Sequence, residues 1–100
     1  MKKVSFSDTF TRHFKRGANS RIKRLYRERL VLFLKDPFDP SLRTHALRHG
    51  WEGHWSFSLD EREGGGTDYR VIFKKARQGY RFIDFGTHDQ LYRPWRRRSE

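Results

Sequence analysis

The chain has 100 residues, of which 23 are lysine or arginine and 12 are aspartate or glutamate, so its formal net charge is +11. A domain this basic favours a polyanion or an acidic protein as its partner, although a merely solvated basic surface would have the same composition. The chain has no cysteine, which excludes disulfides and thiolate metal sites. Its longest apolar run, residues 30–34, is too short to cross a bilayer, and the N-terminus lacks the apolar segment of a signal peptide. These features predict a cytoplasmic protein without a membrane span.

The first predicted elements are a short strand over residues 3–6 and a short helix after it. Ser7 or Asp8 is suited to cap this helix at its N-terminus, and Gly17 is suited to end it. Phe10 and Phe14 are four residues apart, which places both on one face of the helix.

A longer amphipathic helix is predicted next, beginning after Asn19 or Ser20. Its apolar residues follow a spacing of three and four: Ile22, Leu25, Tyr26, Leu30, Phe33 and Leu34. Pro37 ends the helix, because the residue before a proline is sterically pushed out of helical geometry. The basic side chains that fill the gaps face either solvent or a nucleic acid.

The second half of the chain predicts a loop over residues 36–53 and then three strands, over residues 54–60, 69–74 and 80–85. Short glycine-bearing turns separate the strands, which indicates an antiparallel meander. Helices followed by strands are typical of an α+β domain, here a small twisted antiparallel sheet with both helices on one face. Residues 1–95 are predicted to form this single domain, with residues 96–100 as a basic tail. If Val71 and Phe73 pack beneath the helices, Arg70 points to the opposite face, near Ser56 and Ser58. This face is expected to be uncovered, as a surface that an RNA strand could occupy.

Three sequence clusters lie in order along the second half: HALRHGWEGHW at residues 45–55, DYRVIF at 68–73 and GTHDQLY at 86–92. In spacing and order this set resembles the RelE/ParE superfamily of toxins from bacterial toxin–antitoxin systems. The last cluster is most similar to the YafQ branch. The resemblance covers nearly the whole chain, up to Tyr92, and leaves out only residues 93–100.

The resemblance implies a metal-independent endoribonuclease that needs no cofactor and cuts mRNA bound in the ribosomal decoding site. It also implies an acidic antitoxin as protein partner, and contact with mRNA and ribosomal RNA. The catalytic residues it implies are His45, Asp68, Arg70 and His88. Those assigned to substrate binding are His54, Trp55, Lys74 and Tyr92. The chain departs from the YafQ pattern at Ser58, where such toxins carry a histidine; His54, on the same strand face by alternation, is the candidate substitute.

The chemistry of RNA self-cleavage explains why these residue types are needed. The 2′-hydroxyl must lose a proton, the 5′-oxygen must gain one, and the charge on the phosphorane must be stabilised. Histidine suits the two proton transfers because its ordinary pKa, about 6.5, lies near neutral pH. The planar fork of arginine fits two phosphate oxygens, so Arg70 is the expected phosphate clamp, with Asp68 orienting a histidine or the turn.

Each candidate also has an ordinary structural interpretation. His45 can brace a loop, Asp68 and Arg70 can form a surface ion pair, and Trp55 can belong to the core. A zinc site is not expected, since His45 and His49 lack the glutamate of an H-E-x-x-H motif. Two other functions stay open: a ParE-like inhibitor of DNA gyrase, against which the two candidate histidines argue, and a non-catalytic RNA-binding module.

Overall fold

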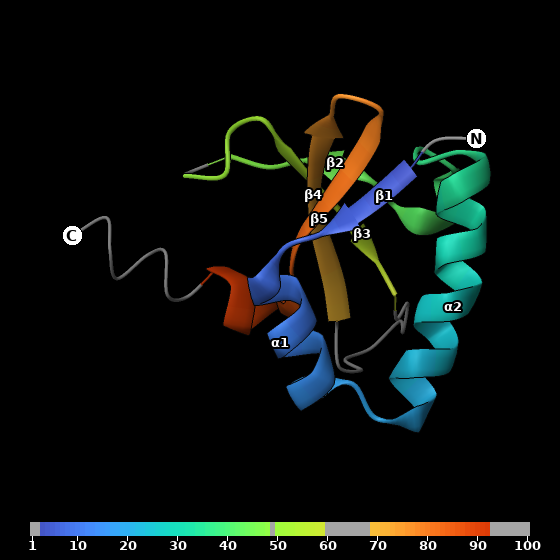
Figure 1. The fold of residues 1–100 in the computed structure, drawn as a ribbon, viewed down its shortest axis with the longest axis vertical. Coiled ribbons are helices and arrows are strands. Elements are labelled where there is room, and N and C mark those ends of the chain that lie inside the picture. Colours follow the sequence, from blue (N-terminus) through green and yellow to red (C-terminus); the bar gives the residue numbers. More distant parts are fainter. Residues whose placement is uncertain (1–2, 49, 60–68, 93–100) are drawn as a thin grey trace.

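The computed structural model in Figure 1 describes residues 3–48, 50–59 and 69–92 of the chain. The predicted tail over residues 96–100, the candidate Asp68 and the tip of the first hairpin lie outside the described residues. The elements in chain order are β1 (Lys3–Phe6), α1 (Asp8–Gly17), α2 (Ser20–Lys35), the 3-10 turn η1 (Pro40–Leu42), β2 (His45–Ala46), β3 (His54–Ser58), β4 (Tyr69–Ala76) and β5 (Gly79–Thr87). Residues 88–92 form a helical turn directly after β5.

Both long helices begin at the predicted caps. The Ser7 side chain accepts a hydrogen bond from the Phe10 backbone N–H at 2.9 Å, and the Asn19 side chain accepts one from the Ile22 N–H at 2.9 Å. Each cap satisfies a backbone donor that the first turn of a helix otherwise leaves unpaired. α2 ends at Lys35, shortly before Pro37, as predicted.

The sheet has five strands in the order β1-β5-β4-β3-β2. The antiparallel meander of β3, β4 and β5 is confirmed, and with it the α+β class. The expectation of a wholly antiparallel sheet was wrong in one respect: β1 pairs with β5 in parallel, from Lys3 with Gly79 to Phe6 with Phe82. The intervening helices and strands return the chain to the same end of the sheet, which a parallel pair requires.

The segment predicted as an uninterrupted loop also contains β2. His45 pairs with Ser56 and Ala46 with Trp55, which extends the sheet beyond β3. Two residues are too few to show an alternating pattern in the sequence, so only the pairing reveals this strand.

The main core lies between the helices and one face of the sheet. The ring of Phe33 on α2 lies 5.1 Å from Phe57, 4.9 Å from Phe73 and 5.1 Å from Phe82. Phe10 on α1 packs against Phe82 at 5.6 Å and is only 4% exposed. Both helices therefore cover one face, as predicted, and aromatic side chains fill the core.

A β-bulge interrupts β5. The register passes from Ile72 paired with Asp84 to Phe73 paired with Phe82, so β5 holds one extra residue, Ile83, at this point. Because of the bulge, Phe82 and Phe85 both face the main core although they are three residues apart.

The opposite face is not bare, which corrects the expectation of an uncovered surface. A second buried cluster lies there, formed by Leu47, Ile72 and Leu91. The partly buried side chains that pack against it are Trp51, Ile83 and Tyr92. The segment after β2 and the turn 88–92 therefore cover part of this face; Figure 1 shows the turn, in red, next to α1.

Candidate active site

Strand pairing places two of the predicted catalytic residues on the face opposite the main core. His45 pairs directly with Ser56, and directly paired residues in antiparallel strands share a face. Arg70 on β4 pairs with Ser58 on one side and Gly86 on the other. His45 is in the row of Ser56 and Ile72, so two strand spacings across the sheet and two residues along β4 separate it from Arg70, a backbone distance of roughly 12 Å.

The turn 88–92 brings His88 to the same face. Its start is a reciprocal capping box: the Gln90 N–H donates to Thr87 Oγ1 at 3.2 Å, and the Thr87 N–H donates to Gln90 Oε1 at 2.9 Å. A Cβ added to Gly86 would lie 3.0 Å from Gln90 Oε1, so the turn sits directly on this glycine. Gly86 is the neighbour of Arg70 in the sheet, which places the turn that carries His88 beside Arg70.

The second cluster joins the three segments that carry the predicted residues. Leu47 lies two residues after His45, Ile72 two residues after Arg70, and Leu91 three residues after His88. Their side chains are 9%, 0% and 4% exposed and pack together. Tyr92 also packs on this cluster, and its ring centroid lies 4.7 Å from that of His88. The structure thus brings His45, Arg70, His88 and Tyr92 to one region.

The two histidines differ in what holds their rings. Nδ1 of the exposed His45 lies 3.0 Å from the carbonyl oxygen of Arg43. A carbonyl only accepts, so Nδ1 carries the proton and Nε2 of the neutral ring is the acceptor. Nδ1 of His88 is 3.7 Å from Asp89 Oδ1, which is too long for a hydrogen bond, and the ring is positioned by Tyr92 instead.

The remaining predicted residues are not all in this region. His54 pairs with Lys74, two same-face rows away from Arg70. Four residues of extended strand separate His54 from Ser58, a distance of roughly 13 Å. His54 therefore cannot reach the position that Ser58 occupies beside Arg70, although it lies on the predicted face.

Trp55 lies on the other side of the sheet. Its ring stacks on Phe73 of the main core at 6.1 Å, and the Lys75 ammonium lies 5.2 Å from its centroid. The alternation of a strand puts Trp55 and His54 on opposite faces. Trp55 is thus separated from the region of His45, Arg70 and His88, which fits its interpretation as a core residue.

Two features of the site were not predicted from the sequence: a contact of Trp51 and two buried hydroxyl groups. Trp51 stands edge-on to the His54 ring at 5.3 Å and packs against the second cluster. The buried Ser56 Oγ and Tyr92 Oη have no hydrogen-bond partner within residues 3–48, 50–59 and 69–92. Nothing in the sequence marks Trp51, because it lies in a segment without periodicity.

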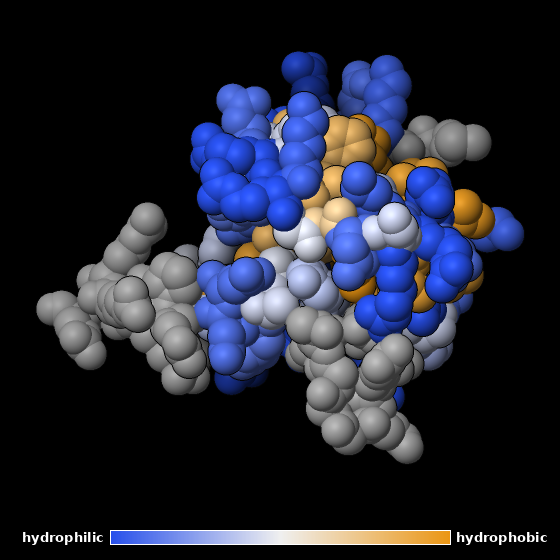
Figure 2. Space-filling model, turned by 90° about the horizontal axis from the view of Figure 1, so that it is seen from below, coloured by the Kyte–Doolittle hydropathy of each residue, from blue (hydrophilic) through white to orange (hydrophobic). Residues whose placement is uncertain are grey.

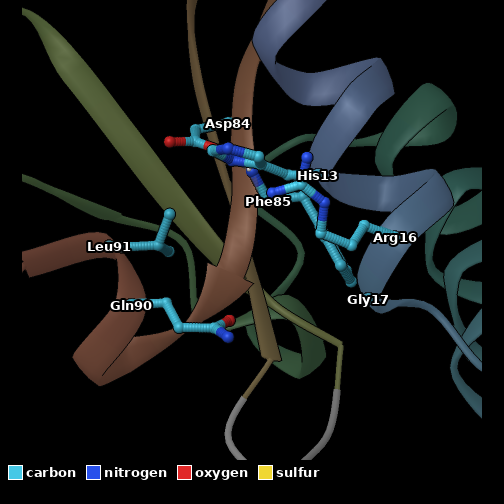
Figure 3. A pocket seen from close by; sticks show the side chains of 7 residues that line it. All are labelled: His13, Arg16, Gly17, Asp84, Phe85, Gln90 and Leu91. Carbon is cyan, nitrogen blue, oxygen red and sulfur yellow. Dashed lines mark hydrogen bonds and ion pairs between the residues drawn. The ribbon is translucent and has the colours of Figure 1, made fainter.

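A third unpredicted feature is a histidine–carboxylate pair. Nδ1 of His13 on α1 lies 2.7 Å from Oδ1 of Asp84, at the bulge of β5. The pair lines a cavity of about 440 Å³ together with Gln90 and Leu91 of the turn 88–92 (Figure 3). The sequence holds one indirect signal of it, since the alternation of core residues in β5 breaks between Phe82 and Phe85.

Within the described ranges, no group of three or more histidine, aspartate or glutamate side chains is arranged to hold a metal ion. No helix in the described part is both long and apolar enough to span a membrane.

Solved structures of bacterial toxins share this fold. YafQ from E. coli superposes with a TM-score of 0.63 over 92% of this chain and 99% of its own, at 20% sequence identity. The E. coli DinJ–YafQ complex matches with a TM-score of 0.62 over 92% and 99% of the two chains, at 21% identity. The YoeB–YefM complex from Staphylococcus aureus matches with a TM-score of 0.63 over 88% of this chain and 98% of the matched chain, at 12% identity. The protein therefore has the fold of the RelE-like toxins.

The family is established by sequence. The profile described as "Bacterial toxin of type II toxin-antitoxin system, YafQ" matches residues 2–93, which is nearly the full chain. The chain thus belongs to the YafQ family and is the toxin of a toxin–antitoxin module, as the resemblance implied. No curated protein matches it significantly in a sequence search.

Proposed function

We propose that this toxin is a metal-independent endoribonuclease that cleaves mRNA on the ribosome. The observation that carries the proposal is the second cluster, whose members Leu47, Ile72 and Leu91 hold the segments of His45, Arg70 and His88 against one another. Catalysis by proton transfer and charge stabilisation requires groups held in fixed relative positions, and a buried cluster provides such a support.

The proposed reaction is internal transesterification. His45 Nε2 takes the proton of the 2′-hydroxyl, the 2′-oxygen bonds to phosphorus, and the bond from phosphorus to the 5′-oxygen breaks. His88 gives a proton to the leaving 5′-oxygen, and Arg70 stabilises the charge on the phosphorane oxygens. The products are a 2′,3′-cyclic phosphate and a 5′-hydroxyl. The tautomer that the Arg43 carbonyl favours supports His45 as the base.

The other predicted residues have supporting roles in this proposal. Asp68 directly precedes β4 and is the carboxylate expected to orient a histidine or the turn. Tyr92, beside His88, offers a ring on which a base can stack. His54 and Lys74 form a neighbouring row on the same face, along which the RNA backbone can extend. Trp55 points to the other face and has no direct part.

An acidic antitoxin is the proposed protein partner. The solved relatives include two toxin–antitoxin complexes, DinJ–YafQ and YoeB–YefM. A chain with a net charge of +11 attracts an acidic partner, and Figure 2 shows hydrophilic side chains around smaller hydrophobic patches on one face. The large apolar side chains that the described part leaves exposed are Phe6, Val31 and Phe38, at 44%, 54% and 47%. Such residues fit an antitoxin segment that is amphipathic as well as acidic.

The test is induced expression in growing cells with mapping of mRNA ends. The wild type is expected to arrest growth and to produce new mRNA ends in register with codons. His45→Ala, His88→Ala and Arg70→Ala should remove both effects while the proteins still fold and bind the antitoxin. Lys15→Ala, an exposed cation on α1 far along the chain from these residues, is the control and should behave as wild type.

Arrest with intact mRNA would contradict the nuclease proposal and would favour a target such as DNA gyrase. The absence of arrest would favour a protein that only binds RNA.

A further inference from the structure

The His13–Asp84 pair lies where α1 meets the bulge of β5. Asp84 is 15% exposed in its side chain and His13 is 39% exposed, so the carboxylate is largely enclosed and the imidazole is half-buried. Figure 3 shows the two side chains meeting between α1 and β5, with Gln90 and Leu91 of the turn 88–92 nearby. Arg16 lines this cavity, and Arg12 lines a second cavity that shares His13 and Asp84 with it.

Several contacts from the N-terminal segment fix the bulge. The Ser7 N–H donates to the Phe82 carbonyl at 2.9 Å, and the Ser7 hydroxyl donates to the Ile83 carbonyl. Asp84 Oδ1 accepts from the Phe85 N–H at 2.7 Å and faces His13 Nδ1 at 2.7 Å. β1 pairs with β5 only as far as Phe82, so beyond that residue β5 is held by its pairing with β4 and by the contacts of α1.

The chain between the bulge and His88 is short and tightly packed. Gly86 lies beneath Gln90, and a Cβ at this glycine would come within 3.3 Å of the Gln90 Cβ. Thr87 and Gln90 then cap the turn reciprocally. Only three residues, all paired with β4, separate Asp84 from His88, so little slack lies between the bulge and the turn.

We propose that His13 is a positioning residue: its hydrogen bond to Asp84 fixes the bulge, and through it the orientation of the turn that carries His88 and Tyr92. The consequence for cleavage rests on the proposed ribonuclease function, whereas the consequence for the orientation of the turn does not. His13 touches no reacting atom in this arrangement and acts only through Asp84.

The experiment compares His13→Leu, which keeps the bulk of the side chain but not the hydrogen bond, with His13→Asn, whose amide nitrogen can replace Nδ1. Lys15→Ala on the exposed side of α1 is the control. Two readouts are made on the folded proteins: NMR contacts between the His88 and Tyr92 rings, with amide exchange across residues 88–92, and steady-state cleavage on programmed ribosomes. Displacement of a catalytic group by about 1 Å lowers turnover by up to roughly a hundredfold.

For His13→Leu we expect the His88–Tyr92 ring contact to weaken, exchange in the turn to speed up, and kcat to fall about ten- to a hundredfold with KM for the ribosome nearly unchanged. His13→Asn should restore all of these. Asp84→Ala removes the bond from the other partner and should reproduce His13→Leu, which keeps the test decisive if one variant fails to fold.

Unchanged ring contacts and exchange in His13→Leu would overturn the proposal, as would a His13→Asn variant that behaves like His13→Leu. If the wild type does not cleave RNA, the ribonuclease proposal fails, and the NMR readouts alone decide whether His13 positions the turn.

Discussion

At the scale of single residues, the surroundings of each side chain decide which chemistry it can perform. The Arg43 carbonyl fixes the tautomer of His45, and the Tyr92 ring restrains His88 without accepting a hydrogen bond from it. Arg43 itself has a φ of 52°, a left-handed conformation that is uncommon outside glycine. The strained residue thus presents the carbonyl that orients the proposed base, an arrangement often found beside functional groups.

Tyr26 gives a prediction about pH. It lies against the Phe14 ring at 4.8 Å, and burial raises its pKa from 10.0 to about 12. Since the folded state keeps the phenol proton at a pH where the unfolded chain has lost it, this stabilisation is complete below pH 10 and is lost as the pH rises toward about 12. An ultraviolet titration of wild type minus Tyr26→Phe should show a tyrosine with its midpoint near pH 12.

The unfolding free energy of Tyr26→Phe should also fall less steeply than that of the wild type in this range. A difference titration with an ordinary tyrosine midpoint would show that the phenol is solvated.

Phe33 gives a prediction about the core. It is 1% exposed and contacts aromatic rings from three strands, so truncation would leave a large cavity. Phe33→Ala should lower the unfolding free energy by about 3–5 kcal/mol, measured by chemical denaturation. Val31, two residues earlier on α2 and 54% exposed, is the control, and Val31→Ala should change stability by less than about 0.5 kcal/mol. Equal losses in the two variants would mean that the ring is not part of a well-packed core.

At the scale of elements, what could be predicted from the sequence depends on whether a local pattern determines the element. α1 and α2 were predictable with their caps, because Ser7 and Asn19 act on the next turn of the same segment. The parallel partner of β1 was not predictable, since pairing depends on contacts far apart in the chain. β2 was too short to show a period.

The same distinction holds for the candidate site. The resemblance and the alternation of β4 placed Arg70 on the face opposite the helices, and strand pairing agrees. The alternation of β3 gave the correct face for His54, but it did not show that His54 lies too far along the strand to replace a side chain at position 58. The contact of His13 with Asp84 joins residues 71 positions apart, and no local pattern predicts such a contact.

Gly79 gives a prediction about the pairing of β1. A Cβ at this position would lie 2.0 Å from the Lys3 carbonyl oxygen and 2.7 Å from the Lys3 nitrogen, so the two backbones could not keep their present separation. Gly79→Ala should therefore displace β1, lower the unfolding free energy by roughly 1–3 kcal/mol and expose the β1 amides to hydrogen exchange.

Gly17 at the end of α1 is the matched control for this substitution. A Cβ there would meet Phe85 Cε1 at 3.5 Å, an ordinary contact, so Gly17→Ala should be neutral or stabilising by up to about 1 kcal/mol. If Gly79→Ala were as stable as Gly17→Ala with protected β1 amides, the close approach of β1 to β5 would be refuted.

At the scale of the whole molecule, net charge governs the association with a partner, while side-chain packing governs the arrangement of the candidate site. The net charge of +11 is spread over a chain whose described part measures 41 × 33 × 25 Å. Such a charge raises the rate of association with RNA or an acidic protein and makes binding depend strongly on salt. The cluster of Leu47, Ile72 and Leu91 is buried, so salt has little effect on the arrangement it supports.

Because salt is expected to affect association but not the packed site, we can predict how salt changes ribosome binding and cleavage. A protein that neutralises several phosphates loses roughly a thousandfold or more in affinity between about 50 and 200 mM salt. We expect a loss of this order for the wild type, measured by sedimentation with programmed ribosomes, and a nearly constant rate of cleavage once the ribosome is saturated. A variant with Lys23, Arg24 and Arg27 changed to glutamine removes exposed cations from α2, and tests whether this helix meets RNA. A shallower salt dependence in that variant would place α2 in the ribosomal interface. An unchanged salt dependence of binding in the variant would favour phosphate contacts on the sheet face that carries Arg70 and Lys74. If binding of the wild type were insensitive to salt, electrostatic recognition of the ribosome would be contradicted.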